Sequence, residues 1–100
     1  MNSCLTLILP RSLEEQVIDI LLQHPDWIGP FTTHPADGHG APGAMTSPAE
    51  QVRGRTERVR IEILIHDNHA REMISVLHDE FRGAQVFWWL TPVIDAGSFA

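Results

Sequence analysis

The sequence predicts an α+β fold, a ferredoxin-like βαββαβ sandwich in which two helices cover one face of a four-stranded antiparallel sheet. Segments typical of strands and helices follow one another in the order strand, helix, strand, long loop, strand, helix, strand. Two such split βαβ units, joined by right-handed connections, make this sandwich. A chain of 100 residues that is 43% hydrophobic also has the size and composition of one globular domain. We therefore expect a single domain over residues 1–100.

The first strand and the first helix are expected before residue 25. Residues 3–9 are an apolar run of strand-forming residues. Ser12 and Glu15 have the spacing of a capping box, which predicts a helix from there to about Gln23. His24-Pro25 ends this helix, because the residue before a proline disfavours helical geometry.

A second strand and a long loop are expected next. Residues 27–34 predict a less regular strand, in which Pro30 fits an edge or a bulge. The segment that follows, about 36–52, is rich in glycine and proline and shows no hydrophobic period. Such a loop buries little apolar surface to offset its ordering entropy, so we expect it to be mobile without a ligand.

The third strand has the clearest pattern in the sequence. Within Thr56–His66, four apolar residues alternate with a second set: Val59, Ile61, Ile63 and Ile65 against Arg58, Arg60, Glu62 and Leu64. Asp67 or Asn68 can cap the second helix. Its apolar stripe is Ala70, Met73, Ile74, Leu77 and Phe81. Gly83 then predicts a left-handed terminator.

The last strand, Gln85–Val93, is apolar on both faces, and its neighbours Trp88 and Trp89 must point to opposite faces. We expect one tryptophan in the core, where truncation to alanine costs about 3–5 kcal/mol. The other then lies on the face without helices. An uncovered row of large aromatic residues predicts oligomerisation through the sheet. Cover by the tail or by the long loop is the alternative.

Composition excludes several classes of function. The net charge is −6 and the chain has no lysine, so binding to nucleic acid over a broad surface is not expected. No apolar run is long enough for membrane insertion, and the first residues lack the pattern of a signal peptide, so we expect a cytoplasmic protein. Cys4 is the only cysteine and is expected to be a packing thiol. No serine lies in a nucleophile-elbow pattern, and we do not expect an enzyme.

Two pairs of histidines are candidate metal ligands. His34 and His39 flank Asp37 at the entry to the long loop, and His66 and His69 flank Asp67. Two imidazoles with a carboxylate suit a divalent transition metal. The first pair is the preferred site and the second pair the second choice. For both pairs the alternative remains that the side chains are solvated and bind no metal. His24 and His78 are expected to be isolated surface residues.

Four arginines follow the long loop. Arg53 and Arg55 are candidates for binding an anion, since guanidinium groups bind carboxylate and phosphate in a bidentate manner. Solvated charge remains the alternative. Arg58 and Arg60 are expected to form ion pairs between subunits, with Glu57 and Glu62.

The chain resembles the PII-like superfamily of small trimeric signalling proteins. The segment Val59-Arg60-Ile61-Glu62-Ile63 is very similar to the strand that follows the T-loop in PII, and Asp37-Gly38-His39-Gly40 stands at the T-loop entry. Residues 50–55 and 88–97 look more closely like a proteobacterial PII-like family that is often encoded near heavy-metal efflux systems. The trimeric divalent-cation-tolerance family, CutA, is a more distant resemblance.

The resemblance implies a non-enzymatic homotrimeric regulator, linked to heavy-metal or cation homeostasis, with a membrane efflux protein as a partner. Gly38, Gly40, Arg53 and Arg55 are its ligand-binding candidates, and a ligand or metal would order the loop 36–52. PII-type nucleotide binding is not expected, because most of the phosphate-binding residues of PII are missing here. The alternatives are a metal-buffering tolerance protein, a small ferredoxin-like enzyme and an amino-acid-binding ACT-like module.

Overall fold

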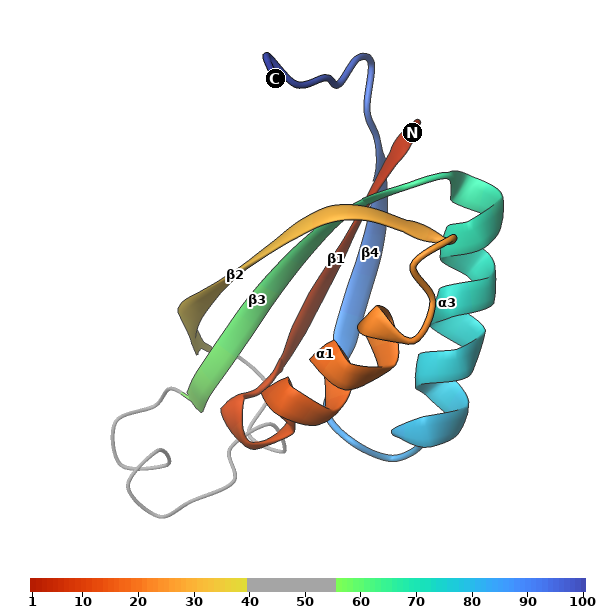
Figure 1. Cartoon of the computed structure of the whole chain (residues 1–100). Coiled ribbons are helices and arrows are strands. Elements are labelled where there is room, and N and C mark those ends of the chain that lie inside the picture. Colours follow the sequence, from red (N-terminus) through yellow and green to blue (C-terminus); the bar gives the residue numbers. More distant parts are fainter. Residues whose placement is uncertain (40–55) are drawn as a thin grey trace.

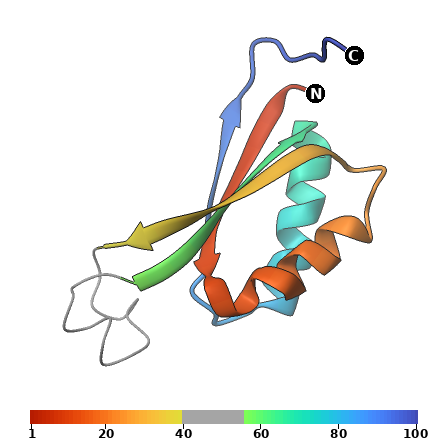
Figure 2. The ribbon, with the colours of Figure 1, turned by 60° about the vertical axis from the view of Figure 1, so that its left-hand side comes forward.

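The structure is a computed structural model, and it describes residues 1–39 and 56–100. The described elements are β1 (Ser3–Pro10), the 3-10 turn η1 (Arg11–Leu13), α1 (Glu14–Leu22), β2 (Ile28–Gly38), β3 (Thr56–Ile65), α3 (Asp67–Glu80) and β4 (Phe87–Pro92). The strands form a four-stranded sheet in the order β2-β3-β1-β4, and every neighbouring pair is antiparallel. Both α1 and α3 lie on one face of the sheet (Figures 1 and 2). The predicted α+β sandwich is therefore confirmed.

The hydrophobic core lies between the sheet and the helices. The four alternating residues of β3 that the pattern assigned to one face are buried, and three of them lie opposite the leucines of β1. The helices close this layer mainly with Val17 and Leu21 from α1 and with Ala70, Met73 and Leu77 from α3. The predicted strand period of β3 and the predicted apolar stripe of α3 are thus confirmed.

Strand β2 is longer than the sequence predicts. It pairs with β3 as far as Gly38, opposite Thr56, whereas the expected strand ends at residue 34. As an edge strand, β2 has one row of backbone groups outside the ladder, so it tolerates prolines that an inner strand would not. Pro30 was expected at an edge or a bulge, and it lies both in an edge strand and at a register shift between Ile28 and Phe31. Residues 36–38 of the expected loop 36–52 belong to this strand, and residues 40–52 lie outside the described part.

The start of α1 corrects the expected capping box. Ser12 lies inside η1, and α1 begins at Glu14 without a side-chain cap. The reason is local. Pro10, with φ of −60°, leads directly into the 3-10 turn, so Ser12 is part of the turn rather than the residue before the helix.

The two tryptophans of β4 lie on opposite faces, as predicted. Trp88 is opposite Leu7 on the helix side, and Trp89 is opposite Thr6 on the other side. Neither of them is buried, and Trp88 remains 50% exposed. The reason is that β4 is an edge strand, with no further strand of the described residues on its outer side. The prediction that one of the two is a fully buried core residue was therefore wrong. No helix of the described residues is long and apolar enough to cross a membrane.

Candidate functional site

The face of the sheet opposite the helices carries the candidate site, and we call it the open face (Figure 2). Side chains of residues paired across neighbouring strands share a face. The register therefore places the following residues on the open face: Cys4, Thr6, Ile8, Thr32, His34, Arg58, Arg60, Glu62, Leu64, Phe87, Trp89 and Thr91.

A row of polar contacts crosses the open face from β2 to β4. One carboxylate oxygen of Glu62, Oε1, lies 3.2 Å from Nε2 of His34 and accepts a hydrogen bond of 3.0 Å from Nε of Arg60. The guanidinium carbon of Arg60 also lies 5.5 Å from the centre of the Trp89 ring. Arg60 is thus held between a carboxylate on its own strand and an aromatic ring on β4. Each contact is partly exposed, so we expect each to contribute only about 0.5–1 kcal/mol.

Large aromatic side chains stand beside this row. Trp89 is 40% exposed and Phe87 is 52% exposed. The core of a protein–protein interface is typically enriched in tryptophan, phenylalanine and arginine and depleted of most other charged residues. In its composition the open face therefore resembles an interface rather than a solvated surface.

Arg58 and Arg60 both have partners within the chain, and the expected ion pairs between subunits stay a prediction. Arg60 pairs with Glu62 within one chain. Arg58 is only 2% exposed, and its guanidinium donates hydrogen bonds to the backbone oxygen and to Oε1 of Gln85, at 3.1 and 3.2 Å. Because Gln85 precedes β4, Arg58 ties the inner strand β3 to the start of the edge strand. The sequence did not show which partners these two arginines have within one chain.

The preferred metal ligands are not brought together within one chain. His34 lies on the open face in the middle of β2, and His39 is exposed just after the strand end at Gly38. An extended strand rises about 3.3 Å per residue, which separates His34 from Gly38 by about 13 Å. The other ligand candidates, Gly40, Arg53 and Arg55, lie outside the described residues. Within residues 1–39 and 56–100, no group of three or more His, Cys, Asp or Glu side chains is arranged to hold a metal.

The second histidine pair belongs to an aromatic cluster that the sequence did not reveal. Trp27 stacks on His24 with ring centres 4.1 Å apart, and its ring centre lies 6.4 Å from that of His69. His66 and His69 meet edge to face at 6.3 Å, and Nδ1 of His69 is buried without a hydrogen-bond partner. His24 is therefore not an isolated residue. The signal in the sequence was the spacing of three between His24 and Trp27, which a turn closes through a hydrogen bond from the Trp27 N–H to the His24 oxygen.

Comparisons with known proteins agree with this geometry. A family model described as "Protein of unknown function (DUF3240)" matches residues 1–100. The chain belongs to the DUF3240 family. A crystal structure of a DUF3240 family protein from Shewanella baltica OS155 has the same fold, with a TM-score of 0.80, 15% identity and coverage of 99% of this chain and 97% of the other.

The fold of this DUF3240 protein is also similar to a second solved structure. That protein is a candidate PII-like signalling protein from Thermus thermophilus, with a TM-score of 0.67 and 17% identity. The match covers 92% of this chain and 85% of the other. No curated protein matches the sequence. The predicted resemblance to the PII-like superfamily is confirmed at the level of the fold.

Proposed function

We propose that this DUF3240 protein is a non-enzymatic PII-like regulator that works as a homotrimer. The observation that carries the proposal is the open face, where Phe87 and Trp89 are half-exposed beside the oriented guanidinium of Arg60. These aromatic rings are the kind of surface that assembly covers. The fold shared with a candidate PII-like signalling protein supports the trimer, because proteins of that superfamily are small trimeric regulators.

The regulated step, in this proposal, is binding of a ligand or a divalent transition metal after β2. Gly38 and His39 are the described residues at the strand end, and Gly40, Arg53 and Arg55 complete that site in this proposal. His34 lies about 13 Å before the strand end, so we propose that it contributes to the site of a neighbouring copy. Strand β2 connects the strand end with the open face, because it is paired with β3 from Gly38 back past His34. A ligand bound at the strand end can therefore change the position of open-face residues and so the affinity between the copies. The link to heavy-metal homeostasis and the efflux partner rest on the family resemblance, and the cytoplasmic location stays the expectation drawn from the sequence.

Native mass spectrometry of the protein without a His-tag tests the assembly. We expect a species of about 34 kDa, three times the chain mass of 11.2 kDa. The same spectra, recorded before and after chelation, report bound metal and bound nucleotide. A protein that stays at the mass of one chain at micromolar concentration contradicts the trimer.

Titration calorimetry with zinc, copper and nickel tests the metal. The parent should bind at least one of them, and the double variant His34→Ala/His39→Ala should bind it more weakly. Affinity should fall as the pH is lowered, because a protonated imidazole cannot bind a metal. His78→Ala removes an exposed histidine of α3 and serves as the matched control. If the double variant binds like the parent, the site lies elsewhere.

A metal-buffering protein is the second candidate function. The observation that favours it is the His66 and His69 pair, where a buried Nδ1 of His69 has no hydrogen-bond partner. In the same titration, loss of binding in His66→Ala/His69→Ala but not in His34→Ala/His39→Ala would favour this function. The small-enzyme alternative needs an apolar pocket between helices and sheet. Between the helices and the inner strands of the described residues, that space is filled by fully buried side chains such as Leu5, Val17 and Met73. A smaller apolar pocket lies at the β4 edge, and His78 is the only titratable side chain among the described residues of its lining.

A further inference from the structure

An apolar pocket lies between α3 and β4, at the edge of the molecule away from α1. Its volume is about 210 Å³, and we call it the α3–β4 pocket. The apolar side chains that line it are Leu7, Ile74, Leu77, Phe81, Val86 and Trp88. The pocket forms where the chain leaves α3, passes the left-handed Gly83 and enters the edge strand.

The size of the α3–β4 pocket suits one aromatic ring. A cavity of about 150 Å³ lined by apolar residues stays dry and accepts a benzene molecule. Trp88, one wall of the pocket, is 50% exposed, so an occupant would bury additional aromatic surface. A phenyl ring inserted here would remove apolar surface from water both on the ring and on the pocket lining.

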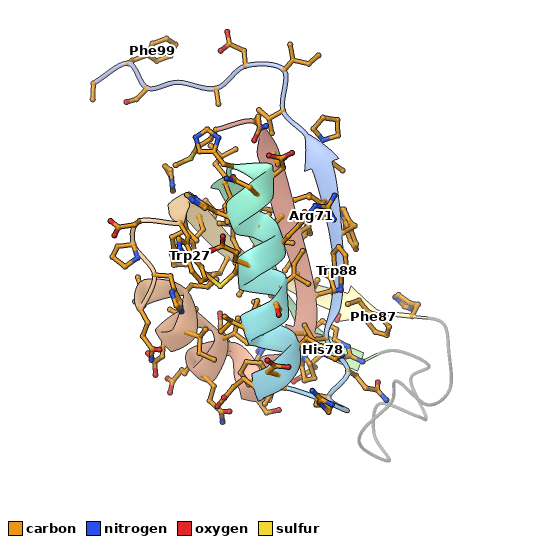
Figure 3. The ribbon with its side chains drawn as sticks, turned by 90° about the vertical axis from the view of Figure 1, so that its right-hand side faces the viewer. Trp27, Arg71, His78, Phe87, Trp88 and Phe99 are labelled. Atoms are coloured by element: carbon orange, nitrogen blue, oxygen red, sulfur yellow. The ribbon has the colours of Figure 1, made fainter. Side chains whose placement is uncertain are left out.

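The same chain carries an unburied phenyl ring. The tail that follows β4 has no regular structure, and its side chains of Ile94 and Phe99 are fully exposed. Figure 3 shows Phe99 at the far end of this tail, away from Trp88 and His78, which line the pocket. The chain thus contains both an apolar pocket and an apolar side chain of fitting size, and these two do not meet within one copy.

The tail leads away from the pocket of its own copy. The Val93 N–H donates to the Asn2 oxygen at 3.0 Å, so the chain keeps the direction of β4 to that point. The pocket lies at the other end of β4, where the chain enters the strand after Gly83. Phe99 therefore lies away from the pocket of its own copy and is available to that of a second copy (Figure 3).

We propose that Phe99 of one copy occupies the α3–β4 pocket of a second copy. The proposal builds on the homotrimer proposed above and is independent of any metal. In a ring of identical chains each copy gives one tail and receives one, and such a head-to-tail contact closes on itself. The pocket and the open face lie on the two sides of the same edge strand, because Trp88 faces the helices while Phe87 and Trp89 face away from them. Burial of one phenylalanine side chain predicts that Phe99→Ser weakens assembly about 10-fold or more.

Disulfide trapping tests this contact with Phe99 in place. In a Cys4→Ala background, Ala84→Cys places a thiol in the pocket lining, and Ala100→Cys places one next to Phe99. Two cysteines are bridged only when their Cα atoms come within about 7 Å. We expect covalent dimers and trimers on a non-reducing gel, and their loss when Phe99→Ser is added. The pair Gln16→Cys/Ala100→Cys, with its first thiol on the exposed side of α1, is the matched control and should not cross-link.

The outcomes separate this proposal from the proposed function. A trimer in native mass spectra whose Ala84→Cys/Ala100→Cys pair does not cross-link, or cross-links equally with Phe99→Ser, overturns the tail contact and leaves the regulator standing. A cross-link confined to single chains also overturns the tail contact. A parent protein that is monomeric overturns both.

Discussion

Gly83 shows how a single residue determines a connection in this fold. It is the only described residue with a positive φ, at 82°, and it turns the chain between the end of α3 and the start of β4. The side of the residue where a Cβ would stand is open, with no atom within 4 Å. Any cost of adding a side chain here is therefore conformational and not steric.

Gly83→Ala should lower the free energy of unfolding by about 1 kcal/mol. A left-handed conformation costs an L-residue about 1–2 kcal/mol, and the reduced entropy of the unfolded chain offsets part of that. Chemical denaturation of the two proteins measures the difference. Gly97→Ala, in the exposed tail, is the control and should change stability by less than about 0.5 kcal/mol. Equal stability of Gly83→Ala and the parent would contradict the assigned backbone conformation.

At the scale of the elements, the start of α3 depends on a residue far away in the sequence. The Asp67 N–H donates to Oδ1 of Asn2 at 3.0 Å, and the next two N–H groups donate to side-chain oxygens of Asp67 and Asn68. The Ala70 N–H donates to the His66 oxygen, so the free donors of the first turn are satisfied. The sequence predicted that Asp67 or Asn68 caps this helix. The N-cap residue is His66, and it makes no side-chain cap bond.

Asn2→Ala should destabilise the protein by about 1 kcal/mol, the usual effect of losing an N-terminal cap. Thermal unfolding followed by circular dichroism measures it. Gln16→Ala, which removes an exposed amide from α1, is the control and should have little effect. A melting temperature of Asn2→Ala equal to that of the control would mean that water replaces the Asn2 oxygen without cost.

The elements also show which features the sequence could predict and which it could not. Period-two and helical patterns depend on which face is buried, so β3 and the apolar stripe of α3 were predictable. Caps and strand ends depend on partners that are distant in the chain. Asn2 reaches α3 across 65 positions, and β2 is extended by pairing with β3. The His24–Trp27–His69 cluster likewise forms only when α1, its turn and α3 come together.

At the scale of the whole molecule, helices cover one face of the sheet and leave the open face uncovered. The helices bury the face that carries Leu5, Leu7 and Leu9, while Phe87 and Trp89 on the other face remain half-exposed. The alternation in β4 could not decide which tryptophan faces the helices, because both faces of that strand are apolar. Only the register with β1 assigns them. The candidate interface was therefore predictable as a sheet face, but its individual residues were not.

Trp89→Ala should weaken the assembly about 10- to 100-fold. Tryptophan is among the residues that most often dominate binding energy at the centre of an interface, and Trp89 also holds the guanidinium of Arg60 in place. Its loss removes apolar area from the interface and leaves the Arg60 charge less well oriented. Sedimentation across a dilution series measures the dissociation constant. Because an assembled protein gains stability with concentration, unfolding should be compared only at concentrations where both proteins are dissociated, and there the difference should be small.

Leu22→Ala is the matched control for Trp89→Ala. Leu22 is also an exposed large apolar residue, 60% exposed, but it lies on α1, on the helix side of the sheet. Truncation there should leave the dissociation constant unchanged. If Leu22→Ala weakens assembly while Trp89→Ala does not, the copies contact one another through the helices. The open face would then be free in the assembled protein, and its row of His34, Glu62, Arg60 and Trp89 would be available to a different partner.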